Sequence, residues 1–186
     1  PWLPLMTTAY DRSYGLDSGL DEYVDAWIPG VNAYAQSTAA IEAARARGRK
    51  IWWYIHSGPD DPYPNFLSED TPTESRSLMG FIAHKSGSDG FLYWYVSQWQ
   101  ETVTRGPLTN ARGRGAGSYN GSGVIFYPGP DGPVPTIRLK AIRDGLEDYE
   151  YLWLLEQAIE KVRDSDGAVV PDDWLVRAEA ALAIDD

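Results

Sequence analysis

The sequence predicts an α/β fold in which about four parallel strands form half of a (β/α)8 TIM-type barrel, followed by C-terminal helices. Two observations lead to this prediction. Short apolar runs alternate with helical segments, which is the order of a parallel sheet covered by helices. The polar loops after these runs are long, whereas helix-to-strand turns such as Gly48-Arg49 are short. A barrel shows the same asymmetry, because its active site is built from the loops after its eight strands.

The predicted strands are continuous apolar runs, as expected for a parallel sheet with both faces buried. They span residues 3–8, 24–28, 50–55 and 90–96. The third run is rich in aromatic and branched residues and follows Gly48, which stands where a helix C-cap is expected. Helices are predicted over the Ala-rich residues 32–47 and over residues 73–86, the second closed by Gly87.

The C-terminal part of the chain begins with a long segment dominated by Gly, Pro, Asn and Ser. This segment, residues 106–135, is predicted to be an irregular loop, and loops of such length tend to be functional. A long helix is expected from Thr136, because its apolar residues keep a period close to 3.6, and a last helix over residues 172–183. We therefore expect one domain, with residues 1–135 as the half-barrel and residues 136–186 as its closing helices.

Composition and charge argue against several partners and cofactors. The 16 Lys and Arg residues face 27 Asp and Glu, a net charge of -11, which disfavours nucleic acid and anionic membrane surfaces. Cysteine is absent and two histidines are too few for a His-based metal site, so no metal is expected. The Gly-rich residues 113–118 lack the flanking strand and the Gly-Lys-Ser/Thr of a phosphate loop, so no nucleotide cofactor is expected either.

The aromatic content, 13% with eight Trp and twelve Tyr, is unusual. An aromatic side chain most often packs in the hydrophobic core, since it buries a large apolar area. Aromatic residues at strand ends also form flat pocket walls, and sugars, with apolar faces and polar edges, fit such walls. His56 ends the Trp-rich strand, where either pocket lining or a structural hydrogen bond is possible.

Adjacent acids can serve carbohydrate chemistry, and Asp21-Glu22 is such a pair. The pair precedes its predicted strand, however, and in a barrel that end holds structural residues. We interpret Asp21-Glu22 as a solvated pair.

Several segments share their order and sequence with one known family. They are the run Asp89 to Trp94, Asn120-Gly121-Ser122-Gly123, Tyr127-Pro128-Gly129, Ile137-Arg138-Leu139, Ile142 to Leu152, Trp52-Trp53-Tyr54, Gly58-Pro59, Pro62-Tyr63-Pro64-Asn65 and Arg76. Together they resemble the C-terminal part of the glycoside hydrolase family 123 catalytic domain, also known as domain of unknown function 4091. The resemblance covers nearly the whole chain.

The resemblance implies the C-terminal half of a barrel that removes terminal β-linked N-acetylgalactosamine from glycans with retention. It implies substrate assistance: the acetamide oxygen of the substrate attacks the anomeric carbon, an Asp orients the acetamide, and the neighbouring Glu is the general acid and base. The family's Asp-Glu pair ends a barrel strand and is normally followed by Pro, whereas Asp21-Glu22 is followed by Tyr23. We therefore expect the catalytic pair upstream of this segment, and the isolated chain to be inactive.

The residues expected to bind substrate are Tyr54, His56, Asn65, Trp94, Trp99 and Asn120. Trp94 is predicted to stack on the pyranose and Tyr54 to hydrogen-bond the acetamide. The expected partners are a glycan and the missing N-terminal half of the barrel or a partner chain, with no nucleic acid and no membrane. The resemblance also suggests a secreted, periplasmic or cell-surface bacterial protein. The alternatives are a non-catalytic carbohydrate-binding module, a catalytically inactive remnant, and an assembly domain whose Trp residues all belong to the core.

Overall fold

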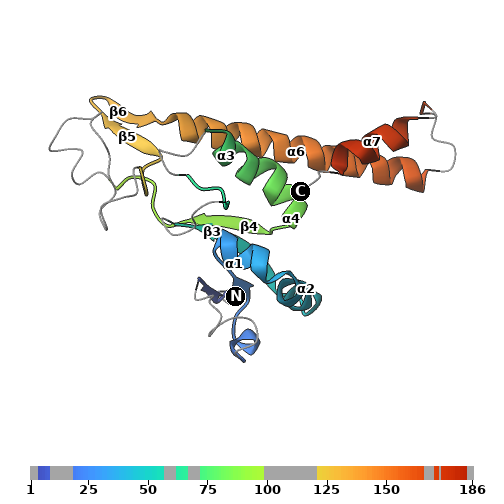
Figure 1. Ribbon diagram of the computed structural model, residues 1–186, viewed down its shortest axis with the longest axis horizontal. Helices are drawn as coiled ribbons and strands as arrows, with labels where there is room; N and C mark the ends of the chain where they lie inside the picture. Colours follow the sequence, from blue (N-terminus) through green and yellow to red (C-terminus); the bar gives the residue numbers. More distant parts are fainter. Residues whose placement is uncertain are drawn as a thin grey trace.

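The protein is described from a computed structural model covering residues 4–8, 19–56, 62–66, 72–98, 121–165, 170–171 and 173–183. Its centre is one parallel sheet, which confirms the predicted α/β class (Figure 1). The strands are β1 (Met6–Thr7), β2 (Ala26–Trp27), β3 (Lys50–Ile55) and β4 (Gly90–Tyr93), and they lie side by side in the order of the sequence. Except for β3, which has the predicted bounds, they are shorter than the apolar runs that predict them.

The predicted helix over residues 32–47 is two helices, α1 (Val31–Gln36) and α2 (Thr38–Ala46). They separate at Ser37, whose φ of -125° and ψ of 27° are not helical. A short 3-10 helix, η1 (Leu20–Glu22), precedes β2.

The predicted helix over residues 73–86 is also composite. It consists of α3 (Pro72–Ser77), the π-helical turn η2 (Leu78–Ile82) and α4 (Ala83–Ser86). Gly87 ends it with a φ of 58°, the left-handed conformation in which glycine is favoured.

Side chains alternate along β3, which differs from the expectation that both sheet faces are buried. Ile51, Trp53 and Ile55 are buried on the side covered by helices. Trp52 and Tyr54 point to the opposite face and are partly exposed. The ring of Trp52 lies over Gly90 of β4, since a Cβ at that position would be 2.5 Å from Trp52 Cε2. The described residues thus bury the helical face of the sheet and leave the other face partly open.

The segment expected to be irregular up to residue 135 contains a β-hairpin. It is formed by β5 (Phe126–Gly129) and β6 (Gly132–Pro135), which pair antiparallel. Pro128 lies opposite Pro133, and Pro135 lies opposite Phe126, two residues further along the ladder. Cross-strand pairs alternate between hydrogen-bonded and non-hydrogen-bonded, so two pairs that are two residues apart are of the same kind. The three prolines therefore all occupy non-hydrogen-bonded positions, which need no backbone donor. The expectation was wrong here because it counted prolines without their spacing.

The C-terminal helices begin as predicted. Thr136 caps the long helix α6 (Ile137–Asp164), its Oγ1 accepting a hydrogen bond from the Leu139 amide at 3.2 Å. The shorter α7 (Trp174–Leu182) packs on α6. In Figure 1, α6 spans the molecule and α3 and α4 lie between it and the sheet.

Two glycines allow α6 to approach α3 and η2 closely. A Cβ on Gly145 of α6 would be 2.4 Å from the Arg76 carbonyl oxygen, and one on Gly80 would be 2.9 Å from the Gly145 carbonyl oxygen. One turn further along α6, Asp148 accepts two hydrogen bonds from Arg76, at 2.6 and 2.8 Å. The Arg-Asp-Gly-Leu-Glu-Asp-Tyr-Glu run starting at Arg143 is thus a helix-packing motif in this structure.

Candidate functional site

The predicted site residues Tyr54, His56 and Trp94 lie at one edge of the sheet. Tyr54 is near the end of β3, His56 follows that strand, and Trp94 follows β4. β3 and β4 are parallel neighbours with Tyr54 opposite Leu92, so their carboxyl ends coincide. The rings of Tyr54 and His56 are 5.3 Å apart. Ligands of open parallel sheets and of barrels bind at this edge.

Trp94 has 36% of its surface exposed and lies against a glycine turn. Gly123 has a φ of +71°, and a Cβ on it would be 2.8 Å from Trp94 Cζ2. The backbone around this turn is tied to the segment after β4, since Gln98 N donates to Gly123 O at 3.0 Å and Ile125 N donates to Val96 O at 2.8 Å. The turn therefore supports one side of the indole, Tyr95 lies against it with ring centroids 5.8 Å apart, and about a third of the Trp94 surface is left exposed.

Tyr93 contributes a polar group that the sequence analysis did not single out. Its hydroxyl accepts a hydrogen bond from Gly123 N at 2.9 Å. Burial raises the pKa of Tyr93, although the Gly123 amide and the charge of Arg138 act in the opposite direction. Burial likewise raises the pKa of Tyr54, so both phenols are neutral hydrogen-bonding groups at pH 7.

His56 and Asn65 are connected through the backbone. Asn65 is 2% exposed, and its Nδ2 donates to His56 O at 2.8 Å while its Oδ1 accepts from Phe66 N at 2.7 Å. These bonds fix the path of the chain after β3. Burial lowers the pKa of His56, which makes its imidazole neutral at pH 7. Substrate contact by Asn65 stays a prediction, and Trp99 and Asn120 lie outside the described residues.

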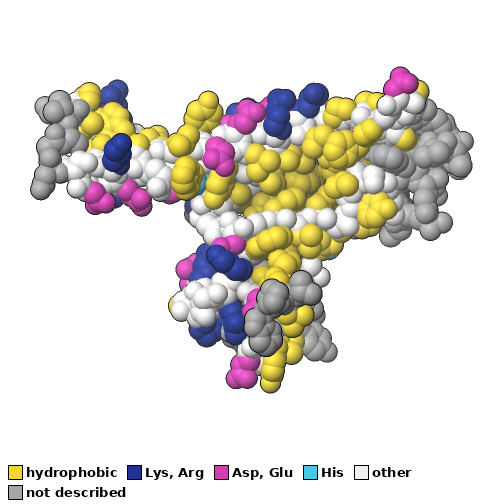
Figure 2. All heavy atoms as spheres, turned by 180° about the vertical axis from the view of Figure 1, so that it is seen from behind, with side chains coloured by type: hydrophobic (Ala, Val, Ile, Leu, Met, Phe, Trp, Pro, Cys, Tyr) yellow, Lys and Arg dark blue, Asp and Glu magenta, His cyan; other side chains and the backbone are white. Residues whose placement is uncertain are grey.

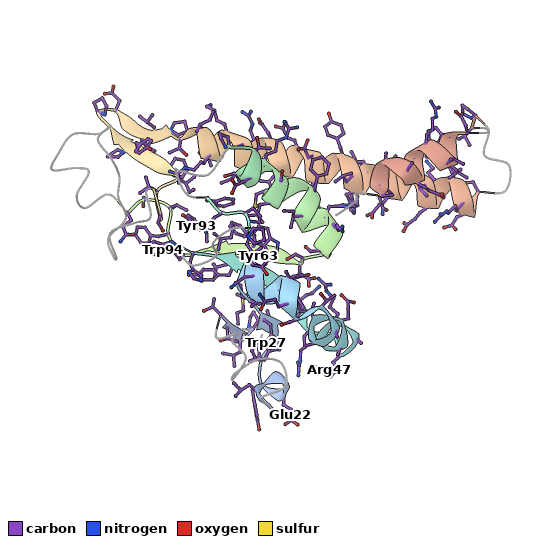
Figure 3. The ribbon with its side chains drawn as sticks, in the orientation of Figure 1. Glu22, Trp27, Arg47, Tyr63, Tyr93 and Trp94 are labelled. Carbon is purple, nitrogen blue, oxygen red and sulfur yellow. The ribbon has the colours of Figure 1, made fainter. Side chains whose placement is uncertain are left out.

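The acid pair lies at the other end of the sheet. Glu22 belongs to η1, which precedes β2, so it is on the amino side of the parallel strands. In Figure 3, Glu22 lies at the bottom of the molecule, well below Tyr93 and Trp94. Glu22 is exposed, whereas the side chain of Asp21 lies outside the described part of the chain, so the solvated pair stays a prediction.

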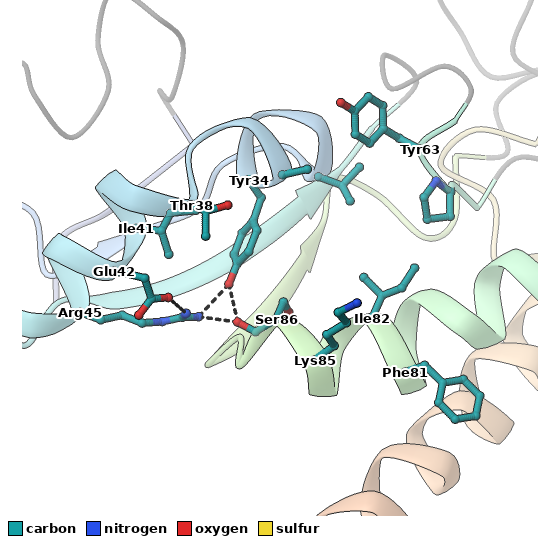
Figure 4. Close-up of a pocket in the computed structure, with 13 residues that line it drawn as sticks. Tyr34, Thr38, Ile41, Glu42, Arg45, Tyr63, Phe81, Ile82, Lys85 and Ser86 are labelled. Atoms are coloured by element: carbon teal, nitrogen blue, oxygen red, sulfur yellow. Dashed lines mark hydrogen bonds and ion pairs between the residues drawn. The ribbon is translucent and has the colours of Figure 1, made fainter. Parts of the chain in front are cut away.

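A cavity of about 580 Å³ lies elsewhere, on the helical side of the sheet (Figure 4). Its walls come from α1, α2, η2 and α4 and include Ile41 and Phe81. Among its lining residues, Arg45 Nη2 donates to Tyr34 Oη and to Ser86 O, at 2.7 and 2.9 Å. None of the described site residues predicted from the sequence lines this cavity.

Neither a metal-ligating cluster nor a membrane-spanning helix is found in the part of the chain that the structure describes. No group of three or more His, Asp or Glu side chains there is arranged to hold a metal ion. No described helix is long and apolar enough to cross a membrane.

Comparison with known proteins assigns the family. The family model described as "Glycoside hydrolase 123, catalytic domain" matches residues 1–155. The chain belongs to glycoside hydrolase family 123. The resemblance noted from the sequence motifs is thereby confirmed.

A solved structure supports the same fold for this family 123 chain. It is a family 123 glycoside hydrolase from Clostridium perfringens, studied for glycolipid glycan hydrolysis, with a TM-score of 0.52 and 20% sequence identity. The alignment covers 78% of this chain and 26% of that enzyme, so the chain matches about a quarter of its length. No curated protein matches the chain.

Proposed function

We propose that this chain is the C-terminal half of a family 123 barrel and supplies substrate-binding walls to a retaining β-N-acetylgalactosaminidase. The observation that supports this most directly is that Tyr54, His56 and Trp94 lie at or directly after the carboxyl ends of two neighbouring parallel strands in a family 123 chain. An active site at that edge is the rule for barrels.

The half-barrel part of the proposal is supported by the sheet itself. Its strands follow one another in sequence order, as in a barrel, and the face carrying Trp52 and Tyr54 is only partly buried. In a closed barrel that face would point inward and be covered by side chains from the other strands. The partners we propose are therefore the complementary half-barrel and a glycan.

The proposed binding mode gives each side chain a task that suits its environment. Trp94, partly exposed and supported by Gly123, stacks on the apolar face of the pyranose. Tyr54 is protonated at pH 7, as a phenol ordinarily is, and burial raises its pKa further, so it can donate a hydrogen bond to the acetamide. His56 is neutral and can accept or donate at a sugar hydroxyl.

Catalysis in this proposal is substrate-assisted and uses carboxylates from outside this segment. The acetamide oxygen forms a bond to the anomeric carbon as the glycosidic bond breaks, and a Glu protonates the leaving oxygen. Water then opens the cyclic intermediate with the same Glu as base. Tyr54 would favour this path by holding the acetamide near the anomeric carbon.

Activity with and without the complementary half tests the proposal. We expect no release of a chromogenic aglycone from a β-N-acetylgalactosaminide by the isolated 186-residue chain. We expect release when the chain is joined to a family 123 half-barrel carrying an Asp-Glu pair, and inhibition by a thiazoline mimic of the cyclic intermediate. Sugar binding without turnover by the joined protein would favour a carbohydrate-binding module or an inactive remnant. Turnover by the chain alone, abolished by Glu22→Gln, would show that Asp21-Glu22 is the catalytic pair.

A further inference from the structure

Arg138 is a buried charged residue in the first turn of α6. It is 3% exposed, and its guanidinium donates to three backbone carbonyl oxygens. Nη1 donates to Phe66 O and to Gly121 O, the latter at 2.9 Å, and Nη2 donates to Val124 O at 2.5 Å. Burying a charge is costly unless hydrogen bonds compensate, so the three carbonyls are an integral part of this arrangement.

The three carbonyls belong to two separate loops, which follow β3 and β4 at the carboxyl end of the sheet. Phe66 lies in the chain after β3, whereas Gly121 and Val124 lie in the chain after β4. Phe66 is 72 residues from Arg138 in the sequence. A planar guanidinium with five donors can bond carbonyls in two directions at once, which an ammonium on a single stem cannot do with the same geometry. Arg138 therefore sets the position of one loop relative to the other.

The contacts of Gly123 extend this effect to the candidate site. Gly123 lies between the two residues of the second loop that Arg138 holds, and Val124 N closes the turn by donating to Gly121 O at 3.0 Å. Gly123 lies against the Trp94 ring, and its backbone amide donates a hydrogen bond to Tyr93 Oη at 2.9 Å.

We infer that Arg138 is a positioning residue of the sugar site: it fixes the Gly121–Val124 turn against the loop after β3 and thereby fixes the orientation of Trp94. The sugar as ligand rests on the proposed function, whereas the effect on Trp94 does not. Arg138 itself touches no substrate in this arrangement.

The test labels the chain with 5-fluorotryptophan and follows each indole by magic-angle-spinning ¹⁹F NMR, which does not require the chain to be monomeric, with the Trp94 signal assigned by Trp94→Phe. In Arg138→Met we expect the Trp94 signal to shift or split while those of the buried Trp27 and Trp53 stay in place. Arg138→Lys should give a smaller change, because a lysine retains part of the donor set. The matched control is Arg143→Met, which removes an exposed arginine of the same helix that pairs with Asp144.

Sugar binding provides the second readout. In the chain joined to its complementary half, Arg138→Met should weaken binding of N-acetylgalactosamine about tenfold, as expected for a displaced aromatic contact. The inference is overturned if Trp94 keeps its signal in Arg138→Met, or if Trp27 and Trp53 move together with Trp94 in both Arg138 variants, since that would mark a general structural role. Absence of sugar binding in the unmodified protein, with the selective Trp94 shift intact, would instead contradict the proposed function alone.

Discussion

At the scale of single residues, position relative to the two ends of a strand is the reason why we propose Trp94 and His56 as binding groups and interpret Asp21-Glu22 as a solvated pair. Trp94 and His56 follow strands of a parallel sheet, whereas Glu22 precedes one. An aromatic ring at the carboxyl end of a strand can offer a sugar an apolar surface. The Glu22 carboxylate, on the amino side of the strands, is exposed to solvent. Residue type alone would have favoured the acid pair.

Replacing Trp94 by alanine should therefore weaken sugar binding more than neutralising the acids. In the chain joined to its complementary half, we expect Trp94→Ala to raise the Kd for N-acetylgalactosamine about tenfold or more, because the indole contact area is lost. Asp21→Asn combined with Glu22→Gln should leave the Kd nearly unchanged. Isothermal titration calorimetry measures the Kd of both variants. Equal or reversed effects would contradict the proposal that Trp94 binds the sugar and that Asp21-Glu22 does not.

At the scale of helices and strands, glycines determine how close α6 lies to its neighbours. Gly145→Ala places a Cβ against the Arg76 carbonyl, and backbone cannot yield as a side chain tip can. Alanine improves the intrinsic stability of a helix by about 1 kcal/mol. We expect overpacking to outweigh that gain and the net loss in free energy of unfolding to be about 1–2 kcal/mol.

Thermal denaturation compares Gly145→Ala with Glu150→Ala, a change to alanine at an exposed position of the same helix. A melting temperature at or above that of the unmodified protein would mean that α6 and η2 can separate at no cost. Gly80→Ala, on the facing helix, should behave like Gly145→Ala.

The ion pair between Arg76 and Asp148 makes the same helix contact depend on pH. Hydrogen bonds from Arg76 hold the pKa of Asp148 below its ordinary value. A carboxyl with a depressed pKa stabilises the folded state above the unfolded pKa, near 4, and loses this effect as the pH falls through the folded pKa. Asp148→Asn should thus lower the melting temperature at pH 7, and the difference should shrink below pH 4. A difference that is constant from pH 7 to pH 3 would show that charge is not involved.

Local sequence signals predicted some elements well and others poorly. β3 has the predicted bounds because its branched and aromatic residues favour a strand and Gly48 ends the preceding helix. The break at Ser37 and the π turn at η2 were not predicted, since they depend on how the helices fit the sheet and α6. The role of Arg138 was missed for the same reason, because its partner Phe66 is 72 residues away. The sequence does contain one signal of its burial, since Arg138 stands between the apolar residues Ile137 and Leu139.

At the scale of the whole molecule, the outermost strands of the sheet each pair with only one strand among the described residues, and one face of the sheet is partly open. β1 and β4 are the outer strands among those described, and large apolar side chains following β4, Tyr95 and Val96, are exposed. Figure 2 shows hydrophobic side chains gathered over the middle of one side of the molecule. Unpaired strand edges next to apolar surface favour association.

The isolated chain should consequently associate with itself or require a partner polypeptide. Size-exclusion chromatography with light scattering should find aggregates or oligomers rather than a 20.7 kDa species. Adding the complementary half-barrel should convert them to a defined complex. A monodisperse monomer that unfolds cooperatively would contradict the half-barrel proposal.

The long sequence separation between Arg138 and Phe66 has a consequence during synthesis. A ribosome makes the chain from its amino end, so both loops of the site leave it before the residue that joins them. Contacts between residues far apart in sequence also form late, because a long segment must first be closed into a loop. Until α6 has emerged, the turn next to Trp94 lacks the bonds from Arg138. A nascent chain halted before residue 138 should thus be unable to hold this turn as the finished chain does, however much of its sheet has formed.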